Sequence, residues 1–186
     1  FANIAKEPIT EAEVARVRAK AAKYYDEVIA SPQQFGVAIS ESIALGDWRL
    51  FFLQRDAYRI EKVIFESRPG YPVTGNLYVP KGRKFPLPGV IGVCGHSLNG
   101  KAAEAYQSFA QALARLGYVV LIFDPAGQGE RFQYLTADLK SRFSGGVGEH
   151  IQMGNQQTLV GEFLGAWFAW DGVRALDYLL SRPEVD

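Results

Sequence analysis

The sequence is poor in several residue types, and each shortage excludes a class of protein. Its one cysteine, Cys94, cannot form an internal disulfide. Lys plus Arg and Asp plus Glu both number 20, so the formal net charge is zero, with neither a basic stripe for nucleic acid nor an acidic tail. No apolar run approaches the ~18–20 residues that a membrane span needs. We therefore expect neither a nucleic-acid nor a membrane partner.

Histidine is also scarce. His96 and His150 are the two histidines of the chain, and no cluster of cysteines or carboxylates stands beside them at metal-ligand spacing. We expect no metal and no cofactor. The chain begins Phe1-Ala2-Asn3, without an initiator methionine or a signal-peptide pattern, so we expect a removed leader or a trimmed start. The sequence does not decide between a cytoplasmic protein and an exported one.

Residues 1–57 are predicted to be a helical N-terminal segment. Thr10-Glu11-Ala12-Glu13 forms a capping box. Apolar residues then recur at helical spacing from Val14 to Val28, and Ser31-Pro32 ends the run.

The pattern changes at Tyr58. Residues 58–66 are predicted to form a strand, and Arg68-Pro69-Gly70-Tyr71-Pro72 a turn. A returning strand over residues 73–79 would complete an antiparallel pair.

The next unit is predicted to be strand, helix, strand. Residues 88–94 form a short apolar run without alternation, as expected of a strand buried on both faces. A tight loop over 95–100 leads into a helix over 101–116, which Gly117 ends. Residues 118–123 form a second buried strand, so the two strands should be parallel. The helix should turn these side chains inward: Ala103, Tyr106, Phe109 or Ala110, and Leu113.

Beyond this unit we expect a polar, glycine-rich surface excursion over residues 130–155, followed by a long helix that Ser181-Arg182-Pro183 ends. The chain stops where another parallel strand is expected. The apolar side chains of the helix step by three or four residues, which predicts a single buried face: Leu159, Phe163, Trp167, Trp170, Val173, Leu176 and Leu180.

An antiparallel pair that leads into a parallel sheet flanked by helices indicates the α/β class. In open sheets of this class, ligands bind at the carboxyl ends of the strands. Those ends are residues 95–100 and 124–129, so a site is expected where these two loops meet.

The first loop, Gly95-His96-Ser97-Leu98-Asn99-Gly100-Lys101, fits more than one kind of site. Gly95-x4-Gly100-Lys101 matches a phosphate-binding loop, but Ala102 replaces the serine or threonine that would bind magnesium. Gly95-His96-Ser97-Leu98 begins like G-x-S-x-G, which would make Ser97 a nucleophile. However, Asn99 stands where the second glycine belongs.

The interpretation that we favour is an oxyanion hole. A tetrahedral acyl intermediate needs preorganised N–H donors where negative charge develops. One such donor comes from the loop after the sheet's third strand, and here it would be the main-chain N–H of His96 or Ser97. A glycine-containing turn without any chemistry is the remaining alternative.

Three segments share a recognisable pattern. They are residues 88–101, which include Cys94-Gly95-His96-Ser97, residues 123–131, which include Asp124-Pro125-Ala126-Gly127-Gln128-Gly129, and residues 170–186. They resemble the acetylxylan-esterase and dienelactone-hydrolase-like branch of the α/β hydrolases, which cleaves esters of sugars and small acids. Cys94 departs from the branch, which usually has histidine there.

The resemblance implies that residues 58–186 are the first part of an α/β-hydrolase-fold domain that stops before the nucleophile elbow. It implies a serine-dependent carboxylic-ester hydrolase acting on acylated carbohydrate or other small esters. In that fold the serine, the acid and the histidine follow in this order, so all three are expected after Asp186. The remainder of the same domain is the expected partner, and the chain alone is expected to be inactive.

Several further expectations follow. Gln128, Arg131 and His150 are predicted at the rim of a substrate pocket, and Asp124 is predicted to have a structural role.

The alternatives to the ester-hydrolase function are a P-loop-like nucleotide-binding protein and a non-catalytic α/β-hydrolase-like binding module. Residues 1–186 alone should be poorly stable, because a parallel sheet ended here exposes an apolar flank. The acyl group, the alcohol and the oligomeric state are not indicated by the sequence.

Overall fold

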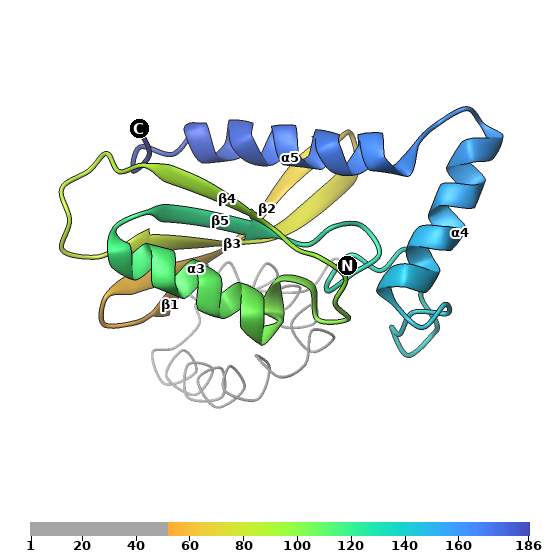
Figure 1. Cartoon of the computed structure of the whole chain (residues 1–186), viewed down its shortest axis with the longest axis horizontal. Coiled ribbons are helices and arrows are strands. Elements are labelled where there is room, and N and C mark those ends of the chain that lie inside the picture. Colours follow the sequence, from red (N-terminus) through yellow and green to blue (C-terminus); the bar gives the residue numbers. More distant parts are fainter. Residues whose placement is uncertain (1–51) are drawn as a thin grey trace, which may run out of the picture.

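The computed structural model describes residues 52–186, which build a five-stranded mixed sheet with helices on both faces (Figure 1). The strand order is β1-β2-β3-β5-β4. Most of the predicted helical segment, residues 1–51, lies outside the described residues. The short strand β1 (Phe52–Gln54) falls at the end of that segment and pairs antiparallel with β2.

The predicted antiparallel pair is confirmed. β2 (Tyr58–Arg68) and β3 (Tyr71–Pro80) form a hairpin whose turn contains Gly70 at φ 71°, a left-handed conformation that glycine adopts without steric cost. β3 then pairs antiparallel with β5 (Val119–Phe123), and β5 pairs parallel with β4 (Gly89–Val93). The hairpin therefore leads into a parallel pair, as expected for an α/β sheet.

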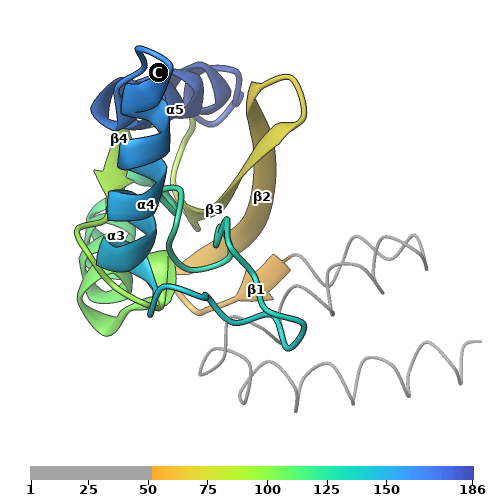
Figure 2. The same cartoon turned by 90° about the vertical axis from the view of Figure 1, so that its right-hand side faces the viewer.

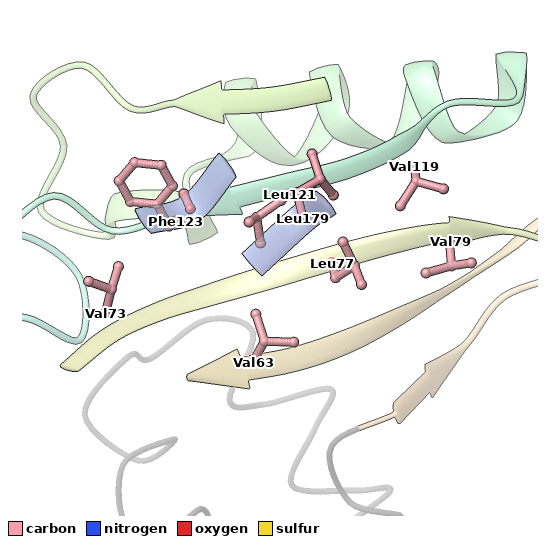
Figure 3. Packing of buried hydrophobic residues seen from close by; sticks show 9 residues of the cluster. Val63, Val73, Leu77, Val79, Val119, Leu121, Phe123 and Leu179 are labelled. Carbon is pink, nitrogen blue, oxygen red and sulfur yellow. The ribbon is translucent and has the colours of Figure 1, made fainter. Parts of the chain in front are cut away.

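The sheet separates the hydrophobic core into two layers, and β5 lies in its interior between β3 and β4. Its side chains are all buried and alternate between the two faces. α5 (Leu164–Leu180) covers one face and α3 (Glu104–Leu116) the other (Figures 1 and 2). The layer under α5, shown in Figure 3, consists of Val63, Val73, Leu77, Val79, Val119, Leu121, Phe123, Ala175 and Leu179. The layer under α3 consists of Tyr58, Ile60, Tyr78, Ala110, Ala114, Val120 and Ile122.

The helix predicted over residues 101–116 is confirmed with a later start. A 3₁₀ turn, η2 (Gly100–Ala102), precedes α3, because Ala103 has extended backbone angles. α3 ends where predicted, with Gly117 at φ 106° donating its N–H to the carbonyls of Leu113 and Ala114. Of the two alternatives for the inward position, Ala110 is buried in the core and Phe109 is exposed.

The surface excursion predicted over residues 130–155 is wrong in its second part. Residues Gly146–Leu159 form a further helix, α4. The sequence did not predict this helix, because glycine is a poor helix former and stands at positions 145, 146 and 148. Gly146 is needed for close packing, since a Cβ there would lie 2.8 Å from Gln128 Oε1.

The predicted buried face of the last helix is also wrong. α4 ends at Leu159, Gly161 adopts φ 77°, and α5 begins at Leu164. The buried residues of α5 are Asp171, Ala175 and Leu179. The small side chain of Ala175 allows α5 to approach the sheet closely. Asp171 is buried because its carboxylate forms an ion pair with the buried side chain of Arg131. The predicted face is largely exposed, including Phe163, Trp170, Val173, Leu176 and Leu180.

β4 is the edge strand of the sheet, and it is not buried on both faces as predicted; Val93 is 70% exposed. Outside β4 itself, Leu87 forms an isolated parallel bridge with Val185. The Leu87 N–H donates to Glu184 O at 2.8 Å, and the Asp186 N–H donates to Leu87 O at 3.0 Å. The segment after α5 therefore begins parallel pairing on the β4 side of the sheet, where the next parallel strand was expected.

None of the helices within residues 52–186 is both long enough and apolar enough to cross a membrane.

Two adjacent leucines of α5 test which face of the helix is buried. Leu179 is 2% exposed and Leu180 is 59% exposed. We expect Leu179→Ala to lower the free energy of unfolding by about 2–5 kcal/mol, because it leaves a cavity under the sheet. The matched control Leu180→Ala should change it by only about 0.5 kcal/mol. Urea denaturation followed by tryptophan fluorescence measures both, and an equal loss from the two variants would contradict the observed orientation of α5.

Candidate active site at the ends of β4 and β5

Two loops lie together at the carboxyl ends of the parallel strands. We call residues 94–101 the β4 loop and residues 124–131 the β5 loop. Because β4 and β5 run parallel, both loops emerge at the same end of the sheet. Figures 1 and 2 show α4 at this end. The site predicted where the two loops meet is therefore brought together by the fold.

A buried carboxylate joins the two loops. Asp124, fully buried at the end of β5, accepts a hydrogen bond from the Lys101 N–H at 2.7 Å through Oδ1. Its Oδ2 accepts from Thr74 Oγ1 at 2.9 Å and from the Glu130 N–H at 3.2 Å. A Cβ at Gly100 or Gly129 would overlap this carboxylate. Asp124 thus has the predicted structural role, and the two glycines allow the main chain to approach it.

The ammonium group of Lys101 is occupied by protein carboxylates. Lys101 is 3% exposed, and its Nζ contacts Asp124 Oδ2 at 2.5 Å and also Glu130 Oε2. Burial by itself lowers the pKa of Lys101, but Asp124 and Glu130 outweigh it, so the net pKa is raised. A phosphate-binding lysine must present its charge to a ligand. The contacts of Lys101 therefore give no support to the phosphate-loop interpretation of Gly95-x4-Gly100-Lys101 or to the nucleotide-binding alternative.

Gln128 fixes the conformation of the β4 loop. This side chain is 1% exposed; its Oε1 accepts the Ser97 N–H at 2.6 Å, and its Nε2 donates to Gly95 O at 3.1 Å. The prediction that Gln128 lines a pocket rim is wrong, because it lies beneath the loop. The Ser97 N–H is already bonded and is not a free oxyanion donor. No hydrogen bond among residues 52–186 uses the His96 N–H, so His96 is the remaining donor of the predicted pair.

Ser97 does not have the surroundings of an activated nucleophile. Its Oγ accepts the Asn99 N–H at 3.2 Å, a local turn contact. Within residues 52–186 no histidine or carboxylate hydrogen-bonds to this hydroxyl. A serine nucleophile requires a base at that position, so the described residues give no support to the elbow interpretation.

The two histidines, 54 residues apart in sequence, are adjacent in the structure. His96 Nε2 lies 3.0 Å from His150 Nδ1, and His150 Nε2 lies 2.7 Å from Ala126 O. The ring of Phe168 packs against His150 at 5.0 Å between centroids. Burial lowers the pKa of His150, the Ala126 carbonyl partly offsets this, and His96 lowers it further. His150 therefore joins α4 to the β4 loop.

Arg131 is buried and does not line a pocket rim, so this prediction is wrong. Its Nη1 donates to Asp124 O at 2.8 Å and to Asp171 Oδ2 at 2.7 Å, and its guanidinium lies 5.0 Å from the centroid of the Tyr71 ring. Arg131 thus ties the β5 loop to α5. Sequence reasoning missed this partner, although an aspartate within an apolar helix was a signal.

The surroundings of Cys94 do not activate its thiol as a nucleophile. Burial raises the pKa of its thiol to about 12, which keeps it protonated near neutral pH, and nucleophilic attack requires the thiolate. Its Sγ contacts Phe123 O at 3.5 Å. Among residues 52–186, no three His, Cys, Asp or Glu side chains are grouped to hold a metal ion.

No protein-family model and no curated protein sequence matches the chain. Solved structures do resemble it. A candidate acetyl xylan esterase from Bacteroides fragilis superposes with a TM-score of 0.59 at 16% identity, over 73% of this chain and 38% of that one. A methylesterase superposes with a TM-score of 0.53 at 27% identity, over 73% of this chain and 26% of that one. A dienelactone hydrolase-like phosphotriesterase from metagenomic libraries gives 0.49 at 23% identity, over 70% and 46%. The chain thus spans less than half the length of each.

Two glycines with positive φ test the close approach to Asp124. Gly100 has φ 51° and Gly82 has φ 67°, but a Cβ at Gly82 meets no atom within 4 Å. Both alanine variants incur the left-handed strain of about 1–2 kcal/mol. We expect Gly100→Ala to lower the free energy of unfolding by a further 1–3 kcal/mol or so, through overlap with the carboxylate. Urea denaturation of the two variants measures the difference, and equal losses would contradict this role of Gly100.

Proposed function

Because the chain has part of the α/β-hydrolase fold and resembles the acetyl xylan esterase and dienelactone hydrolase-like branch in structure, we propose that it belongs to a serine-dependent carboxylic-ester hydrolase. In this proposal the β4 loop supplies one donor of the oxyanion hole. The substrate would be an acylated carbohydrate or another small ester. The partner of residues 58–186 would be the remainder of the same domain.

One observation carries the proposal. The main-chain N–H of His96 has no hydrogen-bond partner among residues 52–186, while the groups on both sides of it, Gly95 O and Ser97 N–H, are held by Gln128. An unpartnered N–H in a loop that is held on both sides of it, at the carboxyl end of a strand, meets the requirement for a preorganised oxyanion donor. The donor costs no reorganisation when the negative charge develops.

The proposed reaction is the serine-dependent ester hydrolysis that the resemblance implies, with the His96 N–H as one donor. A serine oxygen attacks the ester carbonyl carbon, and a histidine takes the serine proton. The carbonyl oxygen becomes negatively charged and is stabilised by the His96 N–H together with the N–H of the residue after the serine. The alcohol leaves with the proton from the histidine, and water then hydrolyses the acyl-serine.

The serine is proposed to follow Asp186 in sequence. The parallel bridge between Leu87 and Val185 supports this position. A strand continuing from Val185 would run beside β4, and its carboxyl end would lie next to the β4 loop. The sharp turn at that end is where this fold carries its nucleophile. The elbow and the His96 N–H would then face a common carbonyl group.

A fluorophosphonate probe tests the proposed nucleophile. We expect the protein that contains this chain to be labelled on a serine outside residues 1–186, because Ser97 lacks a base. Intact mass spectrometry and peptide mapping locate the adduct. A label on Ser97 would return the nucleophile to the β4 loop. Absence of any label would favour the remaining alternative, a non-catalytic binding module with this fold.

Substitution at His96 tests the oxyanion donor. His96→Pro removes the main-chain N–H, and we expect kcat to fall by about 100- to 1000-fold, the usual loss for one oxyanion-hole donor. His96→Ala is the matched control, since it removes the ring and keeps the N–H, and its loss should be far smaller. Circular dichroism checks that both variants fold. Equal losses in the two variants would show that the ring, and not the N–H, is the important group.

A further inference from the structure

The His96–His150 pair is not explained by an oxyanion hole alone. Ala126 O can only accept a hydrogen bond, so the hydrogen of neutral His150 is on Nε2. The lone pair of His150 is then on Nδ1, which must accept the Nε2–H of His96 at 3.0 Å. The contacts thus fix the tautomers of both rings in a chain from the β5 loop through α4 to the β4 loop.

We propose that His150 is a positioning residue, which acts through the His96 ring to hold the His96 main-chain N–H in its catalytic orientation. This inference rests on the proposed function. The ring and the N–H belong to the same residue, so anchoring the ring limits rotation of the main chain at the donor. Gln128 holds the loop from below at Gly95 and Ser97, and His150 holds it from the α4 side.

The surroundings of His150 favour an uncharged ring. His96 and Glu149 are the ionisable groups that influence it, Phe168 packs against it from α5, and Ala126 contacts it from the β5 loop. A Cβ at Gly127 would lie 3.0 Å from His150 Cδ2, so that glycine lets the β5 loop pass close to the ring. Burial holds the pKa of His150 below the ordinary value of 6.5.

The pair has a defined response to acid. A proton on His150 Nδ1 places two N–H donors against each other and breaks the contact. Because the pKa of His150 is lowered, the native pair resists this proton while the unfolded chain accepts it. Stability from the pair is therefore present above about pH 6.5 and declines as pH falls below it.

Two substitutions at position 150 separate positioning from packing. His150→Phe keeps a ring against Phe168 and removes both hydrogen bonds. We expect it to lower kcat about three- to tenfold, the usual effect of one lost hydrogen bond, with little change in KM, because the N–H acts in the transition state. His150→Gln retains a donor and an acceptor and cannot be protonated. It should restore most of kcat and reduce the loss of folding stability that the pair is expected to cause below about pH 6.5.

The measurements use the protein that contains this chain, with kcat normalised to the fraction that fluorophosphonate labels. A double-mutant cycle with His96→Ala should show that His150→Phe causes no further loss, since both remove the same contact. Unchanged normalised kcat in His150→Phe, or an unaltered loss of stability below about pH 6.5 in His150→Gln, would overturn the positioning role. Absence of labelling in the wild type would instead overturn the proposed function, and ¹⁵N NMR of the His150 tautomer would still test the pair.

Discussion

The arrangement of this site depends on a buried carboxylate at the end of β5. Asp124 binds the Lys101 and Glu130 main-chain N–H groups, the Thr74 hydroxyl and the Lys101 ammonium group. A carboxylate removed from water is tolerated only when such partners replace its hydration. Replacing a buried ion pair by apolar residues is often neutral or stabilising, so we attribute to this cluster the geometry of the loops and not the stability of the fold. Both loops must pass close to Asp124, and glycine occupies the two nearest positions.

The fixed loops give the site its chemical character. The ammonium group of Lys101 is paired with the carboxylates of Asp124 and Glu130. In the sequence that resembles a phosphate-binding loop, this lysine therefore joins the two loops to each other. Once Gln128 binds Gly95 O and the Ser97 N–H, the main-chain N–H between them, at His96, has no partner among residues 52–186. Rigid groups that need no reorganisation stabilise a developing charge more than mobile ones do. The contacts of the two loops thus support the proposed oxyanion donor and give no support to a phosphate site.

α4 adds a connection that the sheet alone does not provide. Through His150 it contacts both loops, with the β5 loop at Ala126 and the β4 loop at His96. Its glycine-rich first turn packs against Gln128 and Leu98, so larger residues there would displace the helix. The helix also brings Glu149 into the interior, where its carboxylate accepts the Gln133 N–H.

The sequence by itself determined the order and type of the main elements from Tyr58 to Phe123, because strand alternation, unbroken apolar runs and Gly117 are local signals. It also predicted that the two loops lie together, since the carboxyl ends of parallel strands follow from that order. Only the tertiary structure decided which atoms are free. A hydrogen bond between Gln128 and Ser97, an ion pair between Lys101 and Asp124, and the meeting of His96 with His150 join residues distant in the chain. It likewise decided that α5 turns Ala175 and Asp171 inward, because the fit to the sheet and the partner Arg131 outweighed the apolar stripe.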